Sequence, residues 1–429
     1  QQVLLLSARH FDTTDPDLRM NGAGLRVSHN LGFGVPDAGV AVSLARAWSN
    51  RPPVTTISYS NSNVTPIPDL GLRVVVEGAN VPDNLASLVA LPGSGLHSDQ
   101  GSPAFPLEDV GPADEPITKD LKGHVALVQR DGRGFFCDKL DKAAQAGAAL
   151  AVVQNHTDQT RRIVMAGIDF IPIPAVMINQ IDGEALQGFL QAHPGTRVRL
   201  QYDPARFSFD VRESLICEHV GVRVDTDHTR RGDLRITLVS PMGTRSVLQA
   251  VNTDDTPGPV EWTYYSTQHF FESAAGTWTV EIGDEDDGGS GSVNSVSLVI
   301  RGITITDADR DGLDDDWEMR YFRGLADGPK DDPDRDGFCN AREQVMGSDP
   351  TSANVPFKID LSVWDERLAR LSWPGNISTS YQVRLGIDST APLTTITNVP
   401  GRFPETEWFI PYTEVLNQFF RVQALPTKQ

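Results

Sequence analysis

Two twelve-residue stretches of the chain have the residue types and spacing of calcium-binding loops. In the first, which begins at Asp307, side-chain oxygens occupy positions one, three, five, nine and twelve, and glycine occupies position six. The second begins at Asp332 and repeats the pattern, with asparagine at position nine. Calcium binds about six to eight oxygens, one of them the backbone carbonyl of position seven. The predicted ligands are Asp307, Asp309, Asp311, Leu313, Asp315 and Glu318 in the first loop, and Asp332, Asp334, Asp336, Phe338, Asn340 and Glu343 in the second.

The charge of this region favours metal binding over the alternative of two acidic, solvated linkers. Residues 307–343 contain thirteen acidic and six basic side chains, so without a cation the carboxylates of each loop would repel one another. The loops start 25 residues apart, and position eight holds Asp314 in the first and Cys339 in the second. Because an apolar residue joins paired loops at that position, we expect a metal-stiffened spacer and not a pair that opens and closes. The predicted cofactor is structural calcium, about two ions.

The loops must be held by other elements, and the chain is long enough for several domains. Its 429 residues correspond to roughly three domains of ordinary size. A net charge of −20 argues against nucleic acid or an anionic membrane as partner. No apolar run reaches the roughly eighteen residues that a membrane span requires. Three cysteines are too few for a disulfide-stapled scaffold.

The hydrophobic pattern predicts a multidomain chain of α/β and all-β parts. In residues 54–206, apolar runs at 124–128, 149–153 and 174–178 predict buried strands, and helical periodicity predicts helices over 138–146 and 182–191. Residues 207–303 change to period-two alternation, which indicates an antiparallel β-sandwich. Residues 355–429 show the same alternation on a smaller scale and predict a small β-sandwich. Residues 304–354 hold the two calcium loops.

The first 53 residues predict two helices without a sheet, which is either a free-standing hairpin or the end of a larger domain. A motif of glycines and polar residues supports the second alternative, the end of a larger domain. It reads Asn21-Gly22-x-Gly24-x-x-Val27-Ser28-His29-x-x-Gly32-Phe33-Gly34-x-x-Asp37-Ala38-Gly39. This segment resembles the last part of kexin and furin catalytic domains, so residues 1–53 are expected to be the truncated C-terminal end of a subtilisin-like fold.

The residues that subtilisins use to cut peptides are not found in this chain. The Gly-Thr pairs at Gly195, Gly243 and Gly276 are not followed by serine, and no histidine is followed by glycine. Ser28 and His29 are adjacent, and we interpret them as structural. Acyl transfer needs a nucleophile activated by a base, so no catalytic residue is predicted.

Two further resemblances cover the middle of the chain. Residues 54–206 resemble the protease-associated (PA) domain, a non-catalytic lid or docking surface, and residues 207–303 resemble the P (Homo B) domain, which packs on and stabilises a catalytic domain. The PA-like residues are Lys122-Gly123-x-Val125-Ala126-Leu127-Val128, Ala146-Gly147-Ala148 and Ile173-Pro174-Ala175-Val176. The P-like residues are Glu218-His219-Val220, Arg231-Gly232-Asp233-Leu234, Ser240-Pro241-x-Gly243-Thr244 and Gly276-Thr277-Trp278. The acidic run from Asp284 to Asp287 in this part is either a solvated loop or a further calcium site.

The remaining resemblances concern the C-terminal part. Residues 304–354 resemble the thrombospondin type 3-like and dockerin-like calcium repeats of bacterial secreted proteins, and carry Trp317-Glu318-x-x-Tyr321-Phe322 and Gly347-Ser348-Asp349-Pro350. Residues 355–429 resemble the immunoglobulin- or fibronectin-like appendages of secreted enzymes, which bind a surface or a glycan or act as spacers.

Together these features predict the non-catalytic C-terminal part of a secreted bacterial subtilisin/kexin-like serine endopeptidase, with its signal peptide upstream. The intact parent would cut protein substrates through the catalytic domain, and calcium would be required. The alternative is a calcium-stiffened extracellular adhesion or docking protein with a degenerate protease domain.

Overall fold

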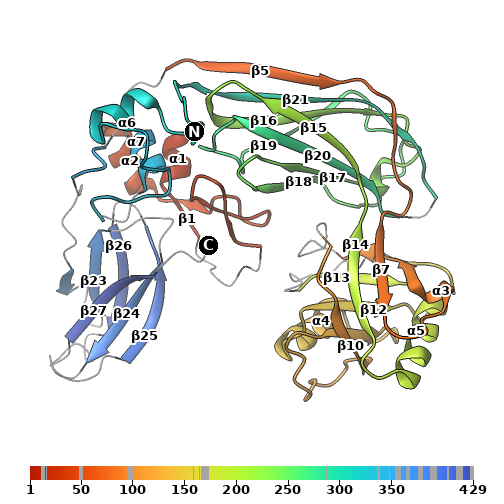
Figure 1. The fold of residues 1–429 in the computed structure, drawn as a ribbon. Helices are drawn as coiled ribbons and strands as arrows, with labels where there is room; N and C mark the ends of the chain where they lie inside the picture. The colour runs from red at the N-terminus through yellow and green to blue at the C-terminus, as the bar shows by residue number, and fades with distance from the viewer. Residues whose placement is uncertain are drawn as a thin grey trace.

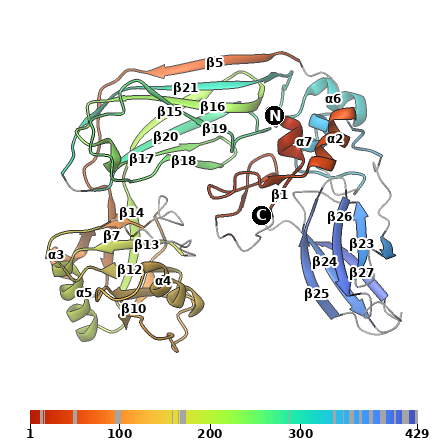
Figure 2. The same ribbon diagram turned by 180° about the vertical axis from the view of Figure 1, so that it is seen from behind.

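The chain is described by a computed structural model that consists of three β-rich bodies and a group of short helices (Figure 1). A long β-sandwich lies between an α/β module at one end and a small C-terminal sandwich at the other. The helices α1, α2, α6 and α7 lie between the long sandwich and the C-terminal sandwich (Figure 2). The described residues are 1–429 without 11–14, 16, 48–51, 94–100, 158, 164, 166–172, 287, 336–338, 347, 353–358, 364–367, 375–379, 387–393, 403–404, 412–418 and 426–429. No helix in this described part is long and apolar enough to cross a membrane.

The long sandwich consists of two antiparallel sheets, with strand orders β15-β20-β17-β18 and β19-β16-β21-β5. Inward-facing side chains alternate with exposed ones, and the core includes the fully buried Trp278, whose indole Nε1 donates to the Ala274 carbonyl at 2.8 Å. The predicted period-two pattern is confirmed. The strands are β5 Val54–Asn61, β15 Ala205–Val211, β16 Leu215–Thr226, β17 Leu234–Val239, β18 Arg245–Gln249, β19 Trp262–Ser266, β20 Gly276–Asp284 and β21 Ser292–Thr304.

The α/β module is inserted into this sandwich. Strand β5 pairs antiparallel with β21 along its whole length, and β6 (Thr65–Pro66) also pairs with β21. Residues 54–66 therefore belong to the sandwich sheet, whereas the sequence assigned them to the α/β domain of residues 54–206. The assignment failed at this end because β5 finds its partner only near residue 300. A local pattern can reveal a strand but not the sheet that it joins.

The α/β module itself is built on an eight-stranded sheet of order β8-β7-β14-β10-β11-β12-β13-β9, in which β10 to β13 run parallel. Apolar side chains fill both faces of the sheet. The predicted strands are confirmed as β11, β12 and β13, and the predicted helices as α4 and α5. The elements are β7 Leu72–Glu77, α3 Asp83–Ala86, β8 Ser87–Val89, β9 Leu91–Pro92, β10 Phe105–Gly111, β11 Val125–Gln129, α4 Phe136–Gln145, β12 Leu150–Gln154, β13 Ala175–Ile178, α5 Gln180–Ala192 and β14 Arg197–Tyr202.

The N-terminal segment, residues 1–47, packs on the long sandwich, and its described residues form two two-stranded sheets, β1-β4 and β2-β3. Its two helices occur where the sequence predicts them, although Trp48, expected in the second, lies outside the described residues. Its apolar residues form one cluster with Ile216, Phe270 and Phe271 of the sandwich. The elements are α1 Gln2–Leu6, β1 Ala8–Arg9, β2 Arg19–Met20, β3 Arg26–Val27, β4 Val35–Pro36 and α2 Ala38–Ala47.

The C-terminal part is a small sandwich of two three-stranded sheets, with orders β22-β23-β26 and β25-β24-β27. Its core places Trp373 edge-on to Tyr381, with ring centroids 5.7 Å apart. The three strands predicted here correspond to β23, β24 and β27. The strands are β22 Asp360–Val363, β23 Leu368–Pro374, β24 Ser380–Gly386, β25 Thr394–Pro400, β26 Glu405–Pro411 and β27 Phe419–Leu425.

Candidate calcium centre

The first predicted calcium loop connects β21 to the helix α6 (Asp315–Tyr321). Asp314 caps this helix, because its carboxylate accepts hydrogen bonds from the backbone N–H groups of Asp316 at 3.1 Å and Trp317 at 3.2 Å. Two residues of the loop have left-handed backbones, Arg310 with φ 64° and Gly312 with φ 96°. These bends fold the loop back over the first turn of α6.

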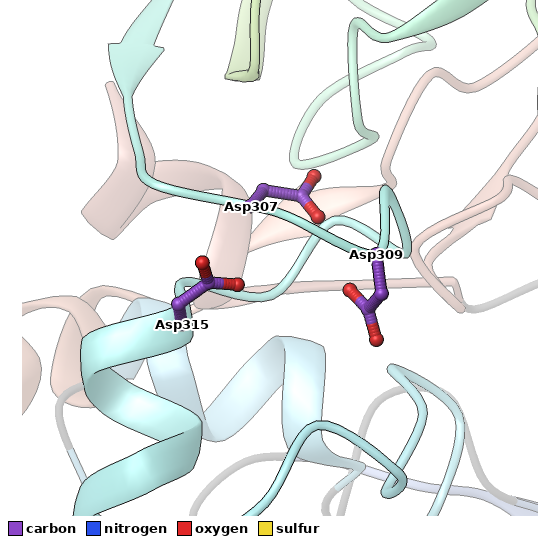
Figure 3. Close-up of side chains that lie close together, drawn as sticks. All are labelled: Asp307, Asp309 and Asp315. Carbon is purple, nitrogen blue, oxygen red and sulfur yellow. The ribbon is translucent and has the colours of Figure 1, made fainter.

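The folded loop brings its carboxylates together. Asp307, only 8% exposed, accepts hydrogen bonds from the N–H groups of Asp311 at 3.1 Å and Gly312 at 3.2 Å. Oxygens of Asp307, Asp309 and Asp315 lie within 4.8 Å of one another, and Figure 3 shows the three carboxylates facing a common space. A second group joins Asp309 and Asp311 to Glu318. Hard oxygen donors at this spacing suit calcium.

Glu318, at the predicted bidentate position, has the strongest electrostatic need for a cation. Its side chain is 0% exposed, and neither carboxylate oxygen has a hydrogen-bond partner among the described residues. Burial, followed by the negative charges of Asp311, Asp309, Asp315 and Asp307, raises the pKa of Glu318 to about 8. Burial also raises the pKa of Asp307 and of Asp311. An ionised carboxylate in such a place needs a compensating positive charge.

Leu313, predicted to contribute its backbone carbonyl, is fully buried in the structure. The five predicted side-chain ligands of the first loop thus fall into two overlapping carboxylate groups, and Leu313 lies in the loop between them.

The second loop is described only in part. Asp332, Asp334, Asn340 and Glu343 lie within the described residues, and Asp336 and Phe338 lie outside them. Asn340 begins helix α7 (Asn340–Met346), and its side-chain Oδ1 is buried without a hydrogen-bond partner among the described residues. Arg335 has a left-handed φ of 62°, at the loop position that Arg310 occupies in the first loop. The two loops therefore share a backbone bend as well as a spacing.

A residue that the sequence did not indicate connects the loops. Gln344 of α7 accepts a hydrogen bond from the Asp314 N–H at 2.5 Å and donates to the Gly312 carbonyl at 3.3 Å. The helix that leaves the second loop therefore supports the backbone of the first. Gln344 follows the last ligand of its loop, and nothing in the loop pattern marks that position.

Ser28 and His29 have structural contacts, as interpreted from the sequence. His29 Nδ1 lies 2.9 Å from Asp17 Oδ2, and Nε2 accepts the backbone N–H of Val247 at 2.9 Å. The Ser28 hydroxyl accepts the N–H of Leu31 at 2.9 Å. Because Nε2 already accepts the Val247 amide, His29 cannot act as the base for a serine. The sequence did not identify Asp17 as the partner of His29.

The long sandwich also has counterparts among known proteins. Residues 217–300 match the family model described as the proprotein convertase P-domain. The sandwich is therefore similar to P-domains, and it is called the P-domain below. Residues 85–186, within the inserted module, match the model of the PA domain. These matches confirm the resemblance to the C-terminal region of kexin- and furin-like subtilases.

Relatives of the P-domain share a limited part of the chain. Furin of Mus musculus is 39% identical over 88 residues, which is 20% of this chain and 11% of furin. Neuroendocrine convertase 2 of Homo sapiens is 42% identical over 69 residues, 15% of this chain and 11% of the convertase. The solved serine protease of Aeromonas sobria covers 70% of this chain and 39% of its own length, at 16% identity and a TM-score of 0.32, which is too loose to bear on the fold.

Proposed function

We propose that this chain is the non-catalytic C-terminal part of a secreted, calcium-dependent, subtilisin/kexin-like serine endopeptidase. In this proposal the P-domain holds the end of the catalytic domain, and the intact parent cuts protein substrates. The observation that carries the proposal is the docking of the kexin-like N-terminal segment on the P-domain.

Asn21, the first residue of the kexin-like motif, is buried against the P-domain. Its side-chain amide donates to the carbonyl oxygens of Gln268 at 2.9 Å and Phe270 at 3.0 Å. Its side-chain oxygen accepts the backbone N–H groups of Ala23 and Leu25. One side chain therefore both shapes the N-terminal turn and joins it to the P-domain.

The next residue, Gly22, makes an equally specific contact. Its N–H donates to Glu272 Oε1 at 2.6 Å and to the Thr244 hydroxyl at 3.0 Å, and a Cβ atom on Gly22 would lie 2.3 Å from Met242 Cβ. Burial alone would raise the pKa of Glu272, but the hydrogen bonds from His269, Thr244 and Gly22 hold it below its ordinary value. Thr244 belongs to the Ser-Pro-x-Gly-Thr motif of the P-domain. The kexin-like motif of the N-terminal segment therefore contacts a P-domain motif directly.

Exposed apolar side chains on the N-terminal segment support the proposal that the rest of a catalytic domain packs on it. Leu4 is 55% exposed, Val42 53% and Val35 50%. These apolar side chains lie on α1, α2 and β4, whose buried residues Leu5, Leu6 and Leu44 pack against the P-domain on their other side. The rest of a catalytic domain would cover them.

The protease proposal is tested by expressing the upstream coding region together with this chain. We expect Asp, His and Gly-Thr-Ser motifs upstream, peptide hydrolysis by the longer protein, loss of that activity in chelator, and no hydrolysis by this chain alone. An upstream region without these motifs would refute the proposal and would leave a calcium-stiffened adhesion or docking protein.

The calcium proposal is tested on the chain itself. We expect chelator to lower the melting temperature of the wild type, and Glu318→Gln to remove most of the difference between calcium and chelator in the first loop. Asp316→Asn is the matched control, because it removes one exposed negative charge from the same helix turn without removing a predicted ligand. A wild type that melts identically in calcium and chelator would contradict the ligand assignment.

A further inference from the structure

Both predicted calcium loops lie close to the place where the N-terminal segment docks on the P-domain. Asn21 and Gly22, which make the docking contacts described above, belong to a turn of residues 21–24, called the docking turn below. The helices that follow the two loops, α6 and α7, lie beside the N-terminal helices α1 and α2 (Figure 1 and Figure 2). Segments almost three hundred residues apart in the chain are therefore neighbours in space.

The first loop touches the P-domain next to the carboxylate that holds the docking turn. Gly312, at position six of the loop, approaches the P-domain so closely that a Cβ atom on it would lie 3.0 Å from Ser273 Cβ. Ser273 directly follows Glu272, whose Oε1 accepts the Gly22 N–H at 2.6 Å. The backbone of the first loop and the docking turn therefore contact adjacent residues of the P-domain.

The second loop touches the docking turn itself. Cys339, at position eight of that loop, places its Sγ 3.8 Å from where a Cβ atom on Gly24 would lie. The helix α7 then leads back to the first loop, because Gln344 donates to the Gly312 carbonyl at 3.3 Å and accepts the Asp314 N–H at 2.5 Å. The docking turn, the two loops and the P-domain thus form a closed ring of contacts.

Side-chain packing alone gives α6 little support from the P-domain. A cavity of about 270 Å³ lies between them, and its lining includes Ile216 and Phe271 of the P-domain, Trp317 of α6 and Gln2 of α1. A cavity of roughly 150 Å³ already holds a benzene ring, so a large part of this boundary lacks dispersion contacts. The loop before α6 is therefore a main support of the helix on the P-domain.

The shape of that loop depends on charge. Its five predicted carboxylate ligands fall into two overlapping groups, and they include Asp307, 8% exposed, and Glu318, 0% exposed. A bound cation would let these carboxylates stay together, whereas without it they repel one another and the buried charge of Glu318 is uncompensated. Opening the loop relieves this repulsion and moves Gly312 away from Ser273.

We propose that calcium binding by the repeats and docking of the N-terminal segment on the P-domain are linked, so that loss of calcium loosens the docking turn. This inference rests on the proposed calcium sites and adds a regulatory role to them. Linkage is reciprocal, so docking strengthens calcium binding by the same factor by which calcium strengthens docking. In the proposed parent protease, the end of the catalytic domain would be held more tightly on the P-domain in a calcium-rich medium.

The first test measures hydrogen exchange of the full chain in millimolar calcium and in chelator. The reporter is a peptide of residues 21–25, because the N–H groups of Gly22, Ala23 and Leu25 are all hydrogen-bonded in the docked turn. We expect its exchange to be on the order of tenfold faster in chelator, which is an ordinary size for coupling between two sites. A peptide that covers β12, buried in the PA domain, is the internal control and should exchange equally in both conditions.

A peptide that covers residues 307–318 separates the two ways in which this test can fail. If calcium protects that peptide and not the docking turn, the loop binds calcium without any link to docking, and the inference is overturned while the calcium proposal stands. If neither peptide responds to calcium, the calcium proposal is refuted and the linkage is refuted with it.

The second test measures the linkage in the opposite direction. Asn21→Ala removes the hydrogen bonds to the Gln268 and Phe270 carbonyls and leaves every predicted calcium ligand in place. Calcium affinity, measured by titration calorimetry, should fall by the same factor, on the order of tenfold. Asn30→Ala is the matched control, because Asn30 is an exposed asparagine of the same segment whose side chain donates to Asp15 within that segment. Unchanged calcium affinity in Asn21→Ala would overturn the linkage.

Discussion

One contact of the N-terminal segment with the P-domain, that of His29 with Val247, is supported by the carboxylate of Asp17. Its side chain is 2% exposed and lies 2.7 Å from Arg19 Nη2 and 2.9 Å from His29 Nδ1. His29 then accepts the N–H of Val247 in β18 through Nε2. Because Nε2 is an acceptor here, Nδ1 carries the proton that Asp17 accepts. Replacing Asp17 should therefore weaken the hydrogen bond from the Val247 N–H to His29 Nε2.

The size of the effect follows from the pKa of Asp17. Burial alone would raise this pKa, but the hydrogen bonds from His29 and the charge of Arg19 outweigh burial and lower it from 3.8 to about 2. At about 1.4 kcal/mol per pKa unit, the charged form gains about 2 kcal/mol in the folded state. Asp17→Asn should cost about this much at neutral pH.

The assay is hydrogen exchange of the Val247 amide, followed in peptides that cover β18. A cost of about 2 kcal/mol corresponds to about 30-fold faster exchange through local opening. The sign of the pH effect is fixed, because a lowered folded pKa gives stability that is complete above the unfolded pKa and lost as pH falls through the folded pKa. The wild type should thus lose protection between about pH 4 and pH 2, and Asp17→Asn should lose this acid dependence. Equal protection of Val247 in both proteins at neutral pH would refute the reasoning.

Three further substitutions test other contacts. Gly22→Ala should lower the melting temperature by the equivalent of about 1–3 kcal/mol, since its Cβ would meet Met242 at 2.3 Å; unchanged melting would mean that the segment does not dock as described. Gly188→Ala lies in the middle of α5, and no described atom outside the nearby backbone of that helix is within 4 Å of the added Cβ. The change should stabilise the PA domain by about 0.5–1 kcal/mol in denaturant unfolding, and a loss of stability would contradict this. Gln344→Ala should weaken calcium binding by the first loop in titrations, because the Gly312 carbonyl loses its donor, and unchanged affinity would show that the loops act independently.

The sequence predicted those features that are local in the chain. Apolar runs identified β11, β12 and β13 because a strand buried on both faces is apolar throughout. Loop spacing grouped Asp307 with Glu318 because all ligands of one loop lie within twelve residues. Each of these patterns is complete within a short window.

Features that depend on distant contacts could not be predicted in the same way. The strand β5 has an ordinary alternating pattern, and its sheet is decided by pairing with β21. Asp233 lies in the Arg-Gly-Asp turn before β17, and its burial, at 1% exposed, appears only when the chain has closed around it. Gln344 and Asp17 likewise acquire their roles from partners that sequence spacing does not identify.

The insertion of the PA domain also sets an order of events during synthesis. The strand β5 leaves the ribosome early, whereas β21, to which it pairs along its whole length, follows only after the entire PA domain and most of the P-domain. The sheet of the PA domain is complete once β14 has emerged, since its eight strands are contiguous in the chain. The PA domain can therefore fold while the P-domain is still unfinished. During that interval the N-terminal segment has no P-domain surface on which to dock, so that contact forms among the last.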